Sequence, residues 1–174
     1  MTDSERLERA RRALAARRPR QQSDTSRVPR RPDPAQVVLS ESQLQLWTAH
    51  ALDPTGSAYT VPAALDIEGP LNADALARAF DWMLARHEGL RLVTDDVRGK
   101  AHARLLPEAP PLRRADLTGI HGTDPAAAER RRDELTEAEL RAPFDLEGGG
   151  PLARGVLITL SPDRHRLVAA FHHL

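Results

Sequence analysis

The C-terminal part of this sequence carries the pattern that most constrains the fold, two apolar segments joined by a short turn. Residues 152–160 and 165–172 have the length and the apolar content of buried strands. Between them, residues 161–164 read Ser-Pro-Asp-Arg, which suits a type I turn with Pro at its second position and Asp at its third. The sequence therefore predicts an antiparallel hairpin whose second strand ends in His172 and His173.

The segments before this hairpin alternate between helix and strand patterns. Apolar residues at three-four spacing, with caps before them, predict helices from the Ser40 cap to about Ala51, over 73–88 after the Asn72 cap, and over 126–140. Short apolar or alternating stretches bounded by turn residues predict strands over 63–68, 90–94 and 101–106. This order predicts an α/β or α+β two-layer fold in which helices pack on a mixed sheet.

The N-terminal segment differs from the rest in charge. Residues 1–35 hold ten Arg and five acidic residues, whereas residues 36–174 carry a net charge of −5. We expect a short basic helix over 1–18, a Pro-rich linker over 19–36, and a domain over 37–174. The basic helix is either a frayed tail or a docking element for an upstream protein. Binding of nucleic acid is less favoured because no aromatic residues interleave with the arginines.

Several classes of protein are poor fits to the whole sequence. There is no cysteine, which excludes disulfides and thiolate metal sites, and the formal net charge is zero. No apolar run approaches the roughly 20 residues of a membrane helix, and the N-terminus lacks the apolar core of a signal peptide. No phosphate loop, dinucleotide fingerprint or nucleophile elbow follows a strand. We expect a cytoplasmic protein that contacts neither nucleic acid nor membrane.

His172 and His173 are the first candidates for chemistry. Adjacent strand residues point to opposite faces of a sheet, so one imidazole is expected to face the core and the other a cleft. An imidazole near neutral pH can take a proton from an amine or hydroxyl nucleophile. The alternative is a pair of histidines with no chemical role. A metal site is disfavoured because neighbouring strand residues cannot converge on one ion.

Two further groups of residues are candidates. Arg86 and Arg91 flank the end of the predicted helix 73–88, where they either stabilise the helix terminus or clamp a carboxylate elsewhere in the fold. Ser40 is expected to act as a helix cap and Trp47 as a core anchor.

These segments together resemble the condensation domains of nonribosomal peptide synthetases. Residues 40–47 (SESQLQLW) resemble the family's first motif, Ser-x-Ala-Gln-x-Arg-Leu-Trp, with Ser42 in place of Ala and Gln45 in place of Arg. Residues 86–91 (RHEGLR) match the second motif, and residues 143–152 (PFDLEGGGPL) resemble the segment Pro-Phe-Asp-Leu followed by Gly-Pro-Leu. The two histidines open the third motif, His-His-x-x-x-Asp-Gly.

The resemblance implies a fold and a reaction. The family has two lobes similar to chloramphenicol acetyltransferase, with the active site in a tunnel between them, and this chain resembles the N-terminal lobe. Acyl and amino substrates arrive on the phosphopantetheine arms of peptidyl or acyl carrier proteins, so carrier proteins are the implied partners. The resemblance implies no directly bound cofactor and no metal.

The resemblance also implies a role for each matching residue. His173 corresponds to the catalytic histidine that orients or deprotonates the acceptor amine, and His172 to the mostly structural one. An arginine among residues 86–91 is expected to pair with the Asp of the third motif. Ser40, Gln43 and Trp47 belong to the first motif and are expected to support the site.

The Asp-Gly half of the third motif does not follow His173 in this sequence, which ends at Leu174. We therefore expect an incomplete domain that does not catalyse condensation by itself and that exposes an apolar face. Two alternatives remain open: part of a stand-alone acyltransferase that uses coenzyme A or a single carrier, or a non-catalytic interaction module that docks through the basic helix.

Overall fold

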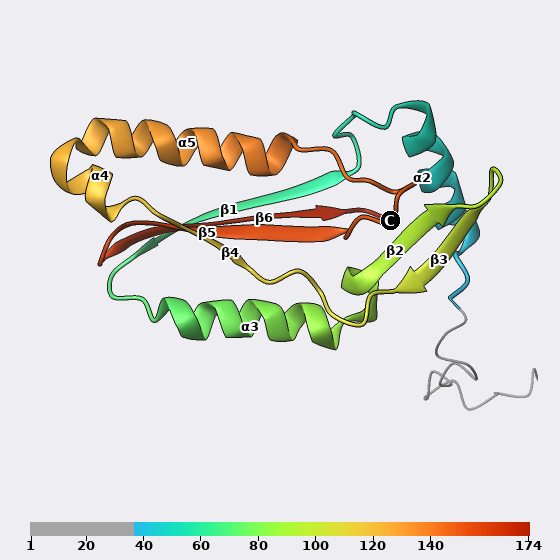
Figure 1. Ribbon diagram of the computed structural model, residues 1–174, viewed down its shortest axis with the longest axis horizontal. Coiled ribbons are helices and arrows are strands. Elements are labelled where there is room, and N and C mark those ends of the chain that lie inside the picture. Colours follow the sequence, from blue (N-terminus) through green and yellow to red (C-terminus); the bar gives the residue numbers. More distant parts are fainter. Residues whose placement is uncertain (1–36) are drawn as a thin grey trace, which may run out of the picture. The chain divides into compact units, whose positions relative to one another are not determined.

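The computed structural model describes residues 37–174, and their helices and strands are traced in colour in Figure 1. The segments 1–18 and 19–36, for which the sequence predicts a basic helix and a linker, lie outside the described residues. None of the helices between residues 37 and 174 combines the length and the apolar character that crossing a bilayer requires.

A four-stranded mixed sheet organises the fold, with strand order β1-β6-β5-β4. β5 (Ala153–Ser161) and β6 (Arg164–His172) form the antiparallel hairpin that the C-terminal sequence predicts. β1 (Thr60–Glu68) pairs with the other side of β6 along all nine of its residues. β6 is therefore an interior strand held on both edges, which fixes the place of its last residue, His172.

The fourth strand and a short helix next to it were not expected from the sequence. β4 (Arg113–Asp116) pairs in parallel with residues 156–159 of β5, and α4 (Thr118–Thr123) follows it directly. The strand reads Arg-Arg-Ala-Asp, so it has no apolar pattern of its own. It is a strand because a neighbouring strand offers its backbone partners, which a single-sequence pattern does not reveal.

Helices cover both faces of this sheet. α3 (Ala73–Arg86) lies on one face and α5 (Pro125–Arg141) on the other (Figure 1). Successive β5 residues alternate between them, since Leu157 belongs to the core cluster that contains α3 residues and Ile158 to the one that contains α5 residues. The mixed α/β sheet with packed helices is as expected, but the two-layer arrangement is corrected to three layers. The nearly continuous apolar run of β5 is typical of a strand buried on both faces.

The boundaries of α3 follow from local chemistry. The side chain of Asn72 accepts a hydrogen bond from the N–H of Ala75 at 2.9 Å, which caps the first turn as predicted. The helix ends at Arg86, two residues earlier than expected, because Glu88–Arg91 turns into a short 3-10 helix, η1.

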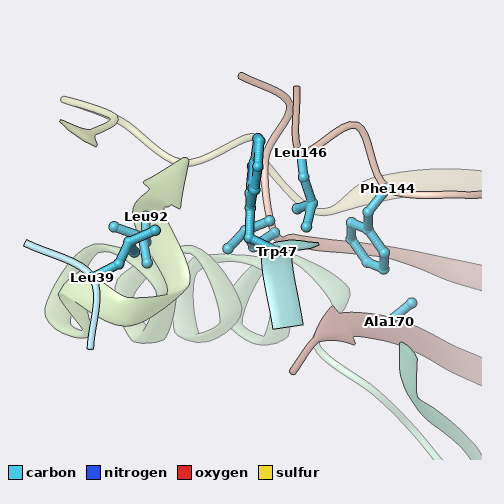
Figure 2. Packing of buried hydrophobic residues seen from close by; sticks show 7 residues of the cluster. Leu39, Trp47, Leu92, Phe144, Leu146 and Ala170 are labelled. Atoms are coloured by element: carbon cyan, nitrogen blue, oxygen red, sulfur yellow. The ribbon is translucent and has the colours of Figure 1, made fainter. Parts of the chain in front are cut away.

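A second, two-stranded sheet lies beside the first and closes the core near the end of β6. β2 (Leu92–Asp96) pairs with β3 (Ala101–Leu105), close to the predicted bounds of both strands. α2 (Glu41–Leu52) contributes Trp47, which points into the apolar cluster shown in Figure 2. The buried members of this cluster are Leu39, Trp47, Leu92, Phe144, Leu146, Leu152 and Ala170. The cluster joins α2, β2, the 143–152 segment and β6 at one end of the four-stranded sheet.

Candidate active site

The candidate site lies where β6 leaves the sheet. His172 is the last residue of the strand and is partly buried, whereas His173 follows it and is exposed. The main-chain N–H of His173 donates a hydrogen bond to the carbonyl oxygen of Tyr59 at 2.8 Å, so the backbone stays held beyond the end of the strand. The two adjacent imidazoles thus have different surroundings, in keeping with the alternation of side chains along a strand.

The imidazole of His172 packs among three other rings. Its centroid lies 5.4 Å from that of His50 and 5.6 Å from that of Phe144, both in edge-to-face geometry, and 6.3 Å from that of Tyr59. These separations are within the range in which aromatic pairs attract one another. The rings hold the side chain of His172 on the inner side of the strand end.

This packing determines the protonation state of His172. The pKa of His172 is lowered from 6.5 to about 4, mainly because burial disfavours the charged imidazolium, with repulsion from His50 and His173 adding to the effect. The ring is therefore neutral near pH 7. Nδ1 lies 3.1 Å from the main-chain nitrogen of Leu174 and accepts its N–H, which leaves the single ring proton on Nε2. Nε2 is buried, and no acceptor among residues 37–174 reaches it.

Ser40 and Gln43 organise the start of α2 and connect it to this strand end. Ser40 Oγ accepts from the N–H of Gln43 at 3.2 Å, and Gln43 Oε1 accepts from the N–H of Ser40 at 2.8 Å, which together make a capping box. The amide nitrogen of Gln43 donates to the carbonyl oxygen of Leu174 at 2.9 Å. The start of α2 is therefore bonded to the residue that follows His173.

Trp47 occupies the core, one turn of α2 beyond Gln43. Its side chain is in the apolar cluster with Phe144 and Ala170, and only 9% of the residue is exposed. Its indole N–H has no acceptor in the part of the chain that the structure describes. These contacts make Trp47 an anchor that fixes α2 against β6. This is the role that the sequence analysis expects for it.

The structure separates the two candidate arginines. Arg86 lies in the last turn of α3 and is exposed. Arg91 is partly buried, and its Nη1 donates to the carbonyl oxygen of Leu106 at 2.6 Å. The Nε of Arg91 is buried without an acceptor among the described residues. Arg91 adjoins Leu92 of the core cluster, whereas no contact within residues 37–174 ties Arg86 to the two histidines.

Two site residues were missed by sequence reasoning, His50 and Tyr59, both of which contact the ring of His172. His50 is buried, and it lies three residues after Trp47 and seven after Gln43, so all three share one side of α2. That spacing could have identified His50. Tyr59 precedes β1 and reaches the site through a strand pairing with β6, for which the local sequence holds no signal.

A partly buried arginine on β5, Arg154, supports Phe144. The guanidinium carbon of Arg154 lies 3.9 Å from the centroid of the Phe144 ring, within the range of a cation–π contact. Arg154 also donates to the carbonyl oxygens of Glu139, at 3.1 Å, and of Ala142, at the end of α5. Burial, and then repulsion from Arg113, lowers the pKa of Arg154. Through these contacts Arg154 joins α5, β5 and the aromatic cluster around His172.

A pocket of about 200 Å³ opens beside this aromatic cluster. It is lined by His50, Pro54, Pro143, Phe144, Asp145, Leu146 and Glu147. No group of three His, Asp or Glu side chains within residues 37–174 is placed to hold a metal ion. Next to the aromatic cluster, the exposed imidazole of His173 stands on a main chain that is hydrogen-bonded to Tyr59 and, through Leu174, to Gln43.

The comparisons with known proteins agree on one family. The family model of the condensation domain matches residues 35–174. Malpibaldin synthetase of Mortierella alpina is 36% identical over 149 residues, which is 84% of this chain and 3% of that protein. Phosphinothricin tripeptide synthetase PhsC of Streptomyces viridochromogenes is 36% identical over 148 residues, or 84% of this chain and 13% of that protein.

Solved condensation domains have the same fold. The first condensation domain of the CDA synthetase is 29% identical with a TM-score of 0.59, over 78% of this chain and 35% of that one. The starter condensation domain of the rhizomide synthetase RzmA is 24% identical with a TM-score of 0.66, over 78% of this chain and 32% of that one. The chain thus spans about a third of the length of these solved domains.

Proposed function

This chain belongs to the condensation-domain family of nonribosomal peptide synthetases, and from that premise we propose that it forms the N-terminal lobe of a domain that joins an acyl thioester to an amine. Both substrates are carried on phosphopantetheine arms of carrier proteins, and the protein binds no cofactor of its own. One of the relatives named above is by its name a tripeptide synthetase, which supports substrates of this class.

In this proposal His173 handles the proton of the acceptor amine. The imidazole orients the amine and accepts a proton as the nitrogen attacks the thioester carbonyl. The new C–N bond forms, the C–S bond breaks, and the thiolate of the donor arm leaves and is then protonated. The neutral His172 holds the backbone behind His173 and takes no part in the transfer.

One observation carries the proposal: the exposed imidazole of His173 on a main chain that is hydrogen-bonded on both sides. A base that abstracts a proton must reach its substrate while its own position stays fixed. His173 meets the first condition by its exposure and the second through the bonds of its own N–H and of the Leu174 peptide.

In the same proposal, residues 1–174 do not catalyse amide formation without a second lobe. A tunnel between two lobes needs the second lobe, which lies outside the segment matched here. We therefore expect that the purified 174-residue chain forms no amide from two loaded carrier proteins. Amide formation by this chain that His173→Ala abolishes would contradict the need for the second lobe.

The catalytic role has its own test. Residues 37–173 replace the corresponding segment of the first condensation domain of the CDA synthetase, and amide formation is measured with loaded carrier proteins. His173→Ala should lower the rate by about 10²- to 10⁴-fold, the usual contribution of a general base. His102→Ala, at an exposed position of β3, is the matched control and should leave the rate unchanged. A folded His173→Ala chimera that retains full activity would overturn the role.

The partners follow from the same family membership. We propose that carrier proteins deliver both substrates, that the basic segment 1–18 docks on an upstream synthetase, and that the protein works in the cytoplasm. A peptide of residues 1–36 should retain the C-terminal segment of an upstream synthetase in a pull-down assay. A peptide with its arginines changed to serine should retain none.

A further inference from the structure

We propose that Gln43 is a positioning residue for His173: its side chain ties the start of α2 to Leu174, the residue after His173, and so determines where the imidazole is presented. The catalytic meaning of this role rests on the function proposed above for His173. We call the hydrogen bond from Gln43 to Leu174 the clamp. It is present in the chain without any substrate, so it can be tested without catalysis.

Three hydrogen bonds hold His173 and Leu174, two from other segments of the chain and one from the neighbouring His172. The N–H of His173 donates to the carbonyl of Tyr59 at 2.8 Å, and the N–H of Leu174 donates to Nδ1 of His172 at 3.1 Å. The carbonyl of Leu174 accepts from Nε2 of Gln43 at 2.9 Å. Only the bond from Gln43 reaches this segment from a helix. Without it, Leu174 is held through its N–H alone.

The chemistry of an amide side chain explains why this position holds glutamine. Helix capping needs only an acceptor for the N–H of Ser40, and a glutamate serves equally well in a capping box. Gln43 uses its oxygen for that bond, at 2.8 Å, and has an NH₂ group left to donate. A glutamate at this position could cap the helix but could not donate to Leu174. The second bond is therefore the one that distinguishes glutamine from glutamate here.

The surroundings of the clamp suit this role. His172 accepts through Nδ1 only while its ring is neutral, and its low pKa keeps the ring neutral at physiological pH. Trp47, on the next turn of α2, is buried in the core, so the helix that bears Gln43 is itself fixed. Because the helix is fixed, the hydrogen bond from Gln43 holds Leu174 at a defined distance and direction from α2.

The test compares Gln43→Glu with Gln45→Glu in the 174-residue chain carrying a C-terminal amide, so that the acceptor at Leu174 is an uncharged carbonyl oxygen and not a terminal carboxylate that would repel the introduced glutamate. Both variants add one negative charge to the first half of α2, but only the first removes a donor to Leu174, because Gln45 is exposed and has no bonded partner among the described residues. Nuclear magnetic resonance measures three quantities: the exchange rates of the His173 and Leu174 amides, the tautomer of His172, and the mobility of the His173 ring. Thermal unfolding reports overall stability.

We expect Gln43→Glu to raise the exchange rates of both amides about three- to tenfold, as loss of one hydrogen bond implies. The variant should also mix the tautomers of His172 and increase the mobility of the His173 ring, while Gln45→Glu matches the wild type. Unchanged exchange and tautomer in Gln43→Glu, or equal effects in both variants, would overturn the clamp.

A second variant keeps the proposal open to refutation if Gln43→Glu unfolds. Gln43→Lys retains a donor for Leu174 but loses the acceptor for Ser40, so it should keep the protection of the Leu174 amide. Loss of that protection in a folded Gln43→Lys chain would count against the clamp. Since every readout is taken on the free chain, failure of His173 as a base in the amide-forming assay would leave these results standing, and the reverse holds too.

Discussion

Protonation of His172 should destabilise this fold, and the effect can be worked out from the structure. The ring lies against His50, Phe144 and Tyr59, and its Nδ1 accepts the N–H of Leu174. A proton on Nδ1 removes that acceptor and places a charge among buried rings. The other titratable groups that face the ring are His50, Tyr59 and His173, and repulsion from the two histidines adds to the effect of burial on the pKa of His172.

The sign and size of the effect follow from linkage. The pKa is about 4 in the folded chain, against an ordinary value of 6.5. As the pH falls below 6.5, the unfolded chain takes up a proton that the folded chain does not bind until about pH 4. The contribution of His172 to the free energy of unfolding is therefore fully present above pH 6.5 and is lost as the pH falls towards 4. The difference between the two values corresponds to about 3 kcal/mol, which we reduce to about 2 kcal/mol because solvent screens a ring that is not fully buried.

The assay is urea unfolding followed by circular dichroism between pH 8 and pH 4. His172→Asn is the informative variant, because its side-chain oxygen can accept the N–H of Leu174 but does not titrate. The variant should lose some stability at pH 7 through lost ring packing, and its free energy of unfolding should fall about 2 kcal/mol less than that of the wild type between pH 6.5 and 4. His102→Asn, at an exposed position of β3, is the control and should follow the wild type.

Comparison between variants also removes the contribution of the carboxylates. Hydrogen bonds and charge from Arg166 lower the pKa of Asp66, and those from Arg114 lower that of Asp74. These groups affect stability only at the acid end of the range, and they do so equally in both chains. The reasoning about His172 is refuted if wild type and His172→Asn lose the same free energy from pH 7 to pH 4.

Three further changes should have separable effects. Ser40→Ala removes the N-cap of α2 and should lower the free energy of unfolding by about 1 kcal/mol in a urea titration, whereas Ser42→Ala, without a cap bond, should not. Arg154→Lys loses the fork that bonds the carbonyls at the end of α5 and should lower it by about 2 kcal/mol; an unchanged midpoint would mean that these bonds contribute nothing. Leu52 is 85% exposed, so Leu52→Lys should slow aggregation, measured by light scattering, without lowering the unfolding midpoint; faster aggregation would show that this side chain is covered in solution.

Much of the fold could be predicted because its signals are local. The cap at Ser40, the cap at Asn72 and the turn over 161–164 each depend on side chains within a few residues of one another. The hairpin β5–β6 and the helices α2, α3 and α5 appear close to their expected positions for that reason. The order of the motifs was also enough to identify the family that the comparisons show.

Other features could not be predicted because distant segments decide them. β4 is polar and becomes a strand only beside β5, and the second helical layer depends on which face of β5 each helix covers. At the site, His50 and Tyr59 reach His172 only through the packing of α2 and the pairing of β1.

The amino-acid sequence alone predicts a strand that delivers two adjacent histidines at its end and a helix cap just before Gln43, since both features depend on neighbours along the chain. The packing of the folded chain shows which imidazole is partly buried and neutral, and that Gln43 bonds to the residue after His173. The physical reason is that burial and hydrogen bonding between segments depend on atoms that are far apart in sequence, 131 positions in the case of Gln43 and Leu174.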